Sequence, residues 1–278
     1  MRTWAALVIG PPDDLVEAAL LDYDIAAIEE TSPESWRVFF ASADSRDSAA
    51  AALRRNFPSL SVESIDVEDD NWAAKSQAGL KAVHVGNIRV APPWDAGSHP
   101  TSQSPNPKSQ TIVINPSMGF GTGHHQTTRL CLLALQKLDL RGRRVIDVGT
   151  GSGVLAIAAS LLGAPDVVGI DDDADAVAAA TENVGLNAGA HVSLATTDLR
   201  GETCEPADVV LGNLTGGLLI AAASQLQALT NPGGLLILSG FLEQEEEAVL
   251  AGFDYHEVIG RGQEDEWVCV TLRRPAVF

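Results

Sequence analysis

The fold is constrained most strongly by residues 144–171. This segment begins with a short apolar run, Val145–Val148, followed by three closely spaced glycines and an apolar stretch of helical length, Val154–Leu162. It ends in a second apolar run, Val167–Ile170, and the carboxylate of Asp171. Short apolar runs are typical of buried parallel strands, and a helix is the usual connection between them. The segment therefore predicts a βαβ unit with glycines in its first turn and an acid at the tip of its second strand.

The glycine turn predicts a ligand site. Gly149, Gly151 and Gly153 lack Cβ atoms, so the backbone there can take positive φ values and approach a ligand closely. Free N–H groups at the start of the following helix face the same crevice. Asp171 comes 22 residues after Gly149, close to the spacing at which an acid accepts from ribose hydroxyls in such units. We therefore expect a ligand that contains adenosine; the alternative is a purely structural turn.

The spacing of the glycines discriminates between adenosine-containing ligands. A dinucleotide fingerprint would place its third glycine at the position of Val154. The pattern Asp147-x-Gly149-x-Gly151-x-Gly153 instead resembles the first motif of S-adenosylmethionine-dependent methyltransferases. A nicotinamide-dependent oxidoreductase is the alternative from a different enzyme class, and cofactor sensing without catalysis is the non-enzymatic one.

Composition narrows the choice of partners. The chain of 278 residues carries 18 basic and 37 acidic side chains, a formal net charge of −19. Such a surface repels nucleic acid and favours a basic partner or a small ligand, although acidity can also serve solubility alone. Three scattered cysteines match no zinc or disulfide pattern. With no signal-peptide pattern and no apolar run of membrane-spanning length, we expect a cytoplasmic protein.

Residues 1–68 are expected to form a small α+β domain of ferredoxin-like type. The predicted order is βαββαβ, with strands at Thr3–Ile9, Ile25–Glu30, Trp36–Ala41 and Leu60–Val67, and helices after Pro12 and at Asp47–Phe57. The segment contains no histidine and no nucleoside signature. We expect it to recognise the substrate; the alternative is an inert packing domain.

The rest of the chain is expected to hold a linker and a second domain. Residues 69–84 form the linker, with a helix over Asp69–Leu80, and residues 85–278 form an α/β domain with a mostly parallel, doubly wound sheet. Pro92–Gln110 is rich in proline and serine and predicts a surface loop. Further predicted elements are strands at His84–Val90, Thr111–Ile114, His191–Ala195, Ala207–Leu211, Leu235–Ser239 and Glu266–Leu272, and helices at Asp173–Leu186 and Leu218–Leu229.

Residues 115–128 form a second informative stretch. Its glycines predict a flexible turn, and Thr127 and Thr128 fall in the first turn of a helix expected to reach Leu138. Hydroxyl and N–H groups at a helix start can hold a carboxylate, such as the amino-acid end of a cofactor. His124 and His125 do not predict a metal site, because adjacent helical residues diverge by about 100° and no partner lies four residues away.

Two polar residues follow later strands. Asn213 comes directly after Ala207–Leu211 and so lies at the carboxyl end of a central strand, where open α/β sheets bind their ligands. Asp198 follows the strand His191–Ala195 and can contact an adenine amine or merely cap a turn.

Several separated motifs together resemble the ribosomal protein L11 methyltransferases of bacteria. They are IVINPSMGFGTGHHQTTRLCL at 112–132, VIDVGTGSGVLAIAA at 145–159, GIDDDADAV with ENVGLN at 169–187, and VVLGNLTG at 209–216. The linker at 69–94 and the C-terminal EDEWVCVTLRR are also similar. The resemblance covers roughly residues 69–278, whereas the first 68 share mainly the expected order of elements.

The resemblance implies a fold, a cofactor and a set of contacts. The fold is a Rossmann-like class I methyltransferase domain, and the cofactor is S-adenosylmethionine. By position, the cofactor contacts are Thr122, Thr128, Gly149, Gly151, Asp171 and Asn213. Asn213 is also the residue implied in catalysis, and no metal is implied. The chain departs from the family pattern at Thr150, where Cys is usual, and at His124 and Gln126, where Thr and Pro are usual.

The implied reaction is methyl transfer to amines of a basic protein. The acceptors would be lysine side chains or the N-terminal α-amine of ribosomal protein L11 of the large subunit. The alternative within the same chemistry is a lysine methyltransferase that acts on another protein.

Overall fold

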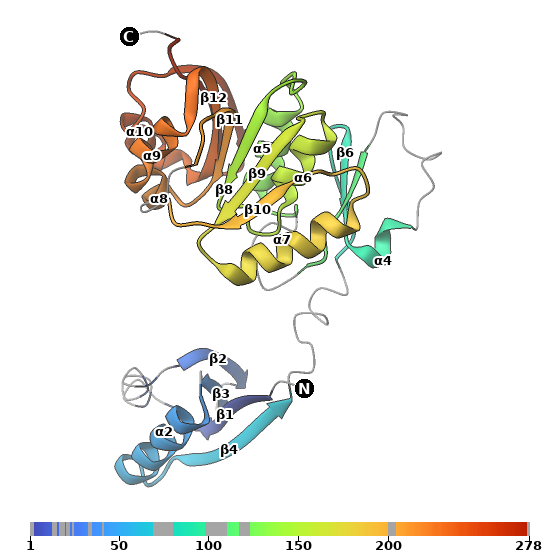
Figure 1. Ribbon diagram of the computed structural model, residues 1–278. Coiled ribbons are helices and arrows are strands. Elements are labelled where there is room, and N and C mark those ends of the chain that lie inside the picture. Colours follow the sequence, from blue (N-terminus) through green and yellow to red (C-terminus); the bar gives the residue numbers. More distant parts are fainter. Residues whose placement is uncertain are drawn as a thin grey trace. The chain divides into compact units, whose positions relative to one another are not determined.

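The chain forms two compact units, residues 1–75 and 76–278. The computed structural model describes residues 3–12, 16, 20, 23, 25–32, 35–40, 42–68, 80–97, 110–116, 123–199 and 204–276 (Figure 1). All of the helix predicted over Asp69–Leu80 except its last residue lies outside this described part. No helix within it is long and apolar enough to span a membrane.

The first unit is a four-stranded antiparallel sheet with a helix packed on it. Its strands are β1 (Thr3–Gly10), β2 (Ile25–Ser32), β3 (Ser35–Phe40) and β4 (Ser61–Glu68), in the order β2-β3-β1-β4, and its helix is α2 (Ala43–Asn56). Alternate strand residues such as Leu7 and Phe40 are buried against Leu53 of the helix. The strand order and antiparallel pairing of the predicted ferredoxin-like arrangement are confirmed, whereas the helix predicted after Pro12 lies mostly outside the described residues.

Helix α2 begins earlier than the sequence pattern suggested. Ser42 is its N-cap, and its Oγ accepts a hydrogen bond from the Ser45 backbone N–H at 3.2 Å. This bond satisfies one of the unpaired amides of the first turn. The helix therefore starts at Ala43 rather than at the predicted Asp47.

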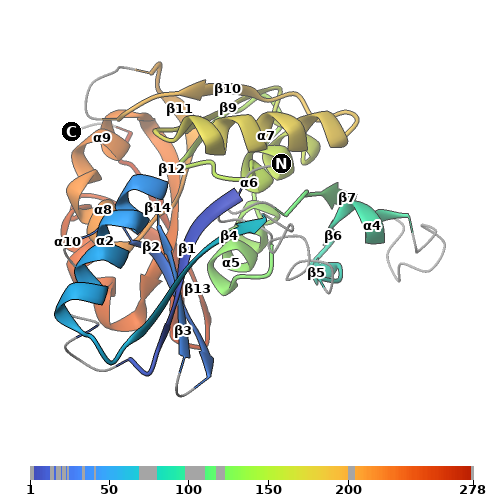
Figure 2. The ribbon, with the colours of Figure 1, turned by 90° about the horizontal axis from the view of Figure 1, so that it is seen from below.

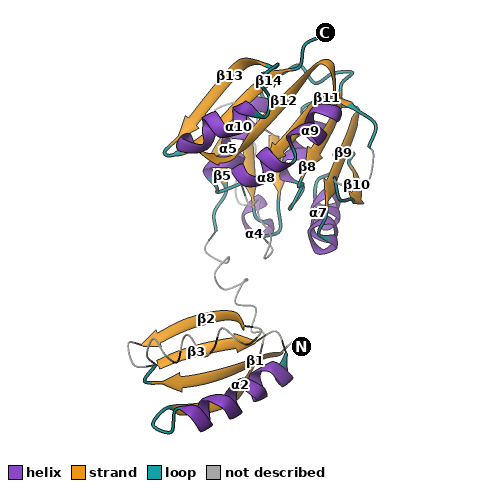
Figure 3. Cartoon of the chain, turned by 90° about the vertical axis from the view of Figure 1, so that its left-hand side faces the viewer, coloured by secondary structure: helices purple, strands orange, loops and turns teal. Residues whose placement is uncertain are grey.

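The second unit is built on a seven-stranded sheet. Its strands are β8 (Arg144–Val148), β9 (Asp166–Asp171), β10 (Ser193–Thr196), β11 (Ala207–Asn213), β12 (Thr230–Leu242), β13 (Glu257–Glu264) and β14 (Trp267–Arg273). The order is β10-β9-β8-β11-β12-β14-β13, parallel from β10 to β12 and antiparallel at β14 and β13. The predicted Rossmann-like, mostly parallel sheet is confirmed (Figure 3).

Helices cover both faces of this sheet (Figures 1 and 2). One apolar core packs strand residues such as Val145 and Leu235 against α5 (Gln126–Leu135) and α6 (Val154–Leu161), and α7 (Ala174–Leu186) joins at its margin. The other packs the alternate residues Ile146 and Leu236 against α8 (Gly216–Ala221), α9 (Ala223–Ala228) and α10 (Glu246–Ala251). Neighbouring residues on a strand point to opposite faces, so a doubly buried strand is apolar throughout.

A smaller sheet lies beside α5, α6 and α7. It consists of β5 (Val83–Val85), β6 (Ile88–Ala91) and β7 (Gln110–Val113), with β5 antiparallel and β7 parallel to β6. The single strand predicted over His84–Val90 is therefore wrong. Gly86 has a φ of 59° and turns the chain with Asn87 into a hairpin.

Three further differences separate the prediction from the structure. The helix predicted over Leu218–Leu229 is divided at Ala222, whose φ of −98° and ψ of 8° interrupt the helical backbone. The loop predicted over Pro92–Gln110 contains a short helix, α4 (Pro93–Ala96), and its remainder from residue 98 to residue 109 lies outside the described part. The edge strand β13 was not predicted, because its glycines and charged residues show no apolar pattern.

Candidate functional site

Three residues meet at one edge of the parallel sheet. In the strand register, Val148 of β8 pairs with Ile170 of β9 on one side and with Gly212 of β11 on the other. The next residues along these three neighbouring strands are Gly149, Asp171 and Asn213. Parallel strands present their carboxyl ends at a common edge, which is where open α/β sheets bind ligands. The structure therefore brings together three of the predicted site residues.

The turn after β8 requires glycine at its first position. Gly149 has a φ of 66°, and a Cβ atom there would lie 2.4 Å from Cδ2 of Leu214. A side chain would thus be strained by the backbone and would also collide with the loop after β11. This close approach makes Gly149 and Leu214 adjacent parts of one pocket wall.

Asp171 is held in a fixed orientation by backbone amides. One carboxylate oxygen accepts from the Gly151 N–H at 2.9 Å, and the other accepts from the Asp173 N–H at 3.1 Å. Each oxygen has a further lone pair, and the side chain is only half-buried. Asp171 can therefore accept hydrogen bonds from a ligand in the adjoining pocket.

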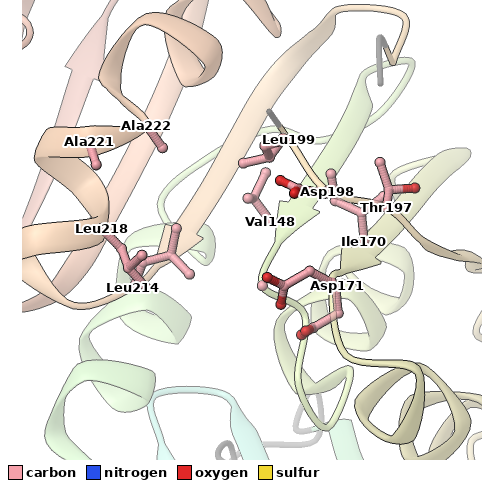
Figure 4. A pocket seen from close by; sticks show the side chains of 12 residues that line it. Val148, Ile170, Asp171, Thr197, Asp198, Leu199, Leu214, Leu218, Ala221 and Ala222 are labelled. Atoms are coloured by element: carbon pink, nitrogen blue, oxygen red, sulfur yellow. The ribbon is translucent and has the colours of Figure 1, made fainter. Parts of the chain in front are cut away.

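The pocket combines apolar walls with carboxylates. Figure 4 shows Asp171 and Asp198 across from Leu214 and Leu218. The other lining residues are Val148, Gly149, Ile170, Asp172, Thr197, Leu199, Ala221 and Ala222. Leu218 is 55% exposed although it is apolar. An apolar slot beside carboxylates that can accept from hydroxyl groups has the chemistry to hold a nucleoside base and its ribose.

The apolar walls were missed by sequence reasoning. Leu214 and Leu218 stand four residues apart directly after Asn213, which is a spacing that places two side chains on one side of a helical turn. That spacing is the sequence feature from which the apolar walls could have been predicted. Asp198 lies at the rim of the pocket and is exposed, so its contact with adenine stays a prediction.

Asn213 and Thr128 meet although they are 85 residues apart. The Asn213 Nδ2 donates to the Thr128 Oγ1 at 3.4 Å, and Thr128 is almost fully buried in the first turn of α5. The Asn213 Oδ1 is buried and has no hydrogen-bond partner among the residues that the structure describes. The site thus contains an unsatisfied acceptor. Thr122, the remaining predicted contact, lies outside the described residues.

Asp147 stabilises the glycine turn from below. Its Oδ2 accepts from the Thr150 hydroxyl at 2.8 Å and from the Ala156 N–H at 3.2 Å. Complete burial raises the pKa of this carboxyl to about 7, although the bonds from Thr150 and Ala156 act in the opposite direction. The Thr150 hydroxyl therefore serves to hold the turn.

The two histidines before α5 make structural contacts. His125 is the N-cap of α5, its Nδ1 lies 2.8 Å from the Thr127 Oγ1, and its ring packs edge-on against Trp267 with centroids 4.8 Å apart. His124 bonds through Nε2 to the Lys81 carbonyl at 2.8 Å. Within the described part of the chain, no three His, Cys, Asp or Glu side chains are grouped to hold a metal ion.

The turn between β13 and β14 is also attached to α5. The Arg129 guanidinium donates from Nε to both oxygens of Glu264 at 3.1 Å and from another nitrogen to the His124 carbonyl. Gln126 donates to Asp265 at 3.3 Å. These bonds orient the first turn of α5, and with it Thr128, toward Asn213.

Comparisons with known proteins agree with this geometry. A family model described as ribosomal protein L11 methyltransferase (PrmA) matches residues 18–275. The ribosomal protein L11 methyltransferase of Geobacter sulfurreducens is 41% identical over 232 residues, which are 82% of this chain and 73% of that protein. Its counterpart in Geotalea daltonii is 35% identical over 285 residues, covering 92% and 88%.

One solved structure gives the same result for the fold. The crystal structure of ribosomal protein L11 methylase from Lactobacillus delbrueckii subsp. bulgaricus superposes with a TM-score of 0.63 at 26% identity. The superposition covers 70% of this chain and 98% of the Lactobacillus chain. The family match extends over parts of both compact units.

Proposed function

The chain belongs to the ribosomal protein L11 methyltransferase family, and from this premise we propose a role for each group of residues at the sheet edge. The enzyme transfers methyl groups from S-adenosylmethionine to a protein. Our proposed substrate is ribosomal protein L11 of the large subunit, with lysine side chains or the N-terminal α-amine as acceptors. A ribosomal substrate also implies a cytoplasmic location.

The pocket residues fit S-adenosylmethionine. The side chain of Asp171 would accept from the ribose hydroxyls, and the apolar walls around Leu214 would enclose the base. The Gly149 backbone would face the amino-acid end, and the absence of a side chain at Gly151, whose N–H donates to Asp171, would leave room for it. Thr128 would contribute its hydroxyl. The direct packing of Leu214 on Gly149, where a Cβ atom would lie 2.4 Å from Cδ2 of Leu214, closes this side of the pocket with a continuous wall. When bound, the cofactor supplies an electrophilic methyl group on a sulfonium.

The buried Oδ1 of Asn213, which no described residue satisfies, is the observation that carries the proposal for catalysis. A buried acceptor without a donor costs free energy, on the order of 1–3 kcal/mol. The incoming amine would donate one N–H to this oxygen. Meanwhile the Thr128 hydroxyl holds the other end of the Asn213 amide. A fixed acceptor orients the nitrogen lone pair, and orientation is the main requirement of an in-line displacement.

The amine must be neutral before it reacts. Neutralising a free lysine near pH 7 costs about 4–5 kcal/mol, whereas an α-amine costs about 1 kcal/mol. Solvent takes this proton before the amine enters the site. The chain's own contribution is therefore alignment and exclusion of water rather than strong base catalysis.

The experiment is methylation of purified ribosomal protein L11 by this enzyme with S-adenosylmethionine, followed by intact-mass analysis. We expect mass steps of one methyl group. Asn213→Ala should lower the methylation rate at saturating cofactor at least about tenfold, with a smaller loss in calorimetric cofactor affinity, because orientation is lost at the reacting nitrogen.

Asn231→Ala is the matched control. Asn231 donates to Asp208 at 3.0 Å near the amino end of β11, so its loss removes a similar bond away from the site. It should leave the rate near the wild-type value. Equal losses of rate and affinity in Asn213→Ala would reduce Asn213 to a cofactor ligand. L11 that stays unmodified would overturn the proposed substrate.

We also propose that residues 1–68 select the protein substrate. This segment carries 13 acidic and 5 basic side chains. Its acidity favours a basic partner, and the glycine turn, Asp171 and Asn213 all belong to the second unit.

A further inference from the structure

Asn183 lies at a junction of three backbone segments. It is on α7 and its side chain is 1% exposed. Its Nδ2 donates to the Ser152 carbonyl at 2.9 Å, and its Oδ1 accepts from the Asn115 N–H at 2.8 Å. Ser152 stands inside the glycine turn, and Asn115 follows β7. One side-chain amide therefore joins the glycine turn to the end of the smaller sheet.

Asn187 makes a related contact one helical turn later. Its Oδ1 accepts from the Val113 N–H at 2.8 Å, and its Nδ2 donates to the Val113 carbonyl at 2.7 Å. It also donates to the Asn183 carbonyl at 2.7 Å. Asn187 thus bonds to the last residue of β7, whereas Asn183 bonds to Asn115 two residues later. The side-chain bonds of Asn187 do not include the glycine turn. The pair offers a comparison in which only one member contacts that turn.

The smaller sheet in turn supports the start of α5. Ile112 of β7 pairs with Val90 of β6. A Cβ atom on Gly123 would lie 2.9 Å from Cγ1 of Val90, so the backbone before α5 rests directly on β6. The bond from His124 to the Lys81 carbonyl adds a second attachment just before β5. Strand β7 is held by its pairing with β6 as well as by the two asparagines, so it can serve as a fixed support for the amide of Asn183.

We propose that Asn183 is a positioning residue for the cofactor site. Its Oδ1 fastens the amide to the backbone that follows β7, and its Nδ2 holds the glycine turn in position relative to that support. Loss of its donor frees the Ser152 carbonyl, and loss of its acceptor leaves the Asn115 N–H without that bond. Buried backbone groups in this state relax toward water or other partners, which shifts the turn. The inference rests on the proposed assignment of Gly149, Gly151 and Asp171 to cofactor binding.

The test compares three variants of the full chain by calorimetric titration with S-adenosylhomocysteine and by thermal unfolding. Asn183→Ala loses both side-chain bonds and should weaken binding about tenfold, because the bond that holds the glycine turn is one of them. Asn187→Ala should lose thermal stability to a similar extent, yet bind within about twofold of wild type. Asn183→Asp keeps an acceptor for the Asn115 N–H, but its ionised carboxylate cannot donate to the Ser152 carbonyl, so at about pH 9 it should bind as weakly as Asn183→Ala.

Hydrogen exchange gives a readout independent of binding. The Asn115 amide should stay protected in Asn183→Asp and lose protection in Asn183→Ala. Wild-type binding by Asn183→Ala or Asn183→Asp, or an equal loss in Asn187→Ala, overturns the inference. If Asn183→Ala does not fold, Asn183→Asp decides alone. Asp171→Ala separates the two hypotheses, because unchanged affinity in that variant rejects the site itself rather than the role of Asn183.

Discussion

Two carboxylates at the glycine turn show how surroundings decide the role of a residue. Asp171 is half-buried, is oriented by two backbone N–H groups and lines the pocket. Asp147 is fully buried and uses one oxygen to hold Thr150 and Ala156. Asp171 can form hydrogen bonds to a ligand at little cost in free energy. Asp147 is more readily protonated because it is buried, as its raised pKa shows.

Asp171→Ala tests the ligand role. The bonds from a carboxylate to ribose hydroxyls are charge-assisted and contribute about 1.5–3 kcal/mol, so cofactor affinity should fall about ten- to a hundredfold. Isothermal titration with S-adenosylmethionine measures this change. Asp175→Ala, which removes an exposed carboxylate that does not line the pocket, serves as the control and should leave affinity near the wild-type value. Unchanged affinity in Asp171→Ala would remove the assignment.

Asp147→Asn tests the effect of burial on stability. The folded-state pKa of Asp147 is about 7, above its ordinary value of 3.8. The folded protein therefore binds more protons than the unfolded chain between these values, and this contribution to stability declines as pH rises through that window. Asn carries no charge and lacks this dependence. Between about pH 5 and pH 8, the wild type should lose at least about 1 kcal/mol relative to the variant.

Denaturant unfolding at both pH values measures this difference. A constant gap between wild type and Asp147→Asn across the window would show that Asp147 is ionised throughout.

At the level of elements, the loop after β11 is fitted between two glycines. Gly149 approaches the Leu214 side chain from β8. Gly240, at the irregular register of β12, has a φ of 96°, and a Cβ atom there would lie 2.2 Å from the Leu214 carbonyl oxygen. The pocket wall can stand where it does only because both neighbouring strands leave room for it.

Gly149→Ala should therefore narrow the pocket. Positive φ costs a side chain about 1–2 kcal/mol, and the added Cβ also presses on Leu214. Gly189→Ala is the control, because Gly189 has a φ of 90° and a Cβ atom added to it would meet no atom within 4 Å. Both variants should lose stability, and only Gly149→Ala should also lose cofactor affinity, about tenfold.

Calorimetry and thermal unfolding check this prediction. Adding Leu214→Ala to Gly149→Ala should restore part of the affinity, because it removes the atom that the new Cβ meets. Equal affinity losses in the Gly149 and Gly189 variants would mean that backbone strain, not the wall, is responsible.

For the whole molecule, the division into two units separates recognition from chemistry in our proposal. The second unit contains the glycine turn, Asp171 and Asn213 together with its own two apolar cores. The first has a separate core and an excess of acidic side chains. Attraction between an acidic surface and a basic substrate weakens with ionic strength, because salt screens charges beyond about 8–10 Å.

Deleting residues 1–68 should abolish methylation of ribosomal protein L11 while cofactor affinity changes less than about threefold. Circular dichroism and thermal unfolding of the truncated chain provide the control for folding. For the full chain, the Michaelis constant for L11 should rise with salt while the maximal rate stays nearly constant. A truncated enzyme that methylates L11 at the normal rate would show that the first unit is not the selector.

By itself, the sequence determined the features of this protein whose physics is local. Apolar runs predicted the parallel strands, the glycine spacing predicted the turn, and strand ends predicted the places of Asp171 and Asn213. These follow from periodicity and backbone freedom, which depend on near neighbours. The hairpin at Gly86 is also encoded locally, by a Gly-Asn pair, although the apolar residues around it favour a single strand.

Only the tertiary structure decided which side chains meet. Asn183 reaches Asn115 across 68 positions, and Asn213 reaches Thr128 across 85. Strand β13 exists because β14 supplies its partner groups, and the Leu214 wall exists because two distant glycines leave space for it. Such contacts depend on the path of the whole chain, and they cannot be predicted from a residue's own neighbours in sequence.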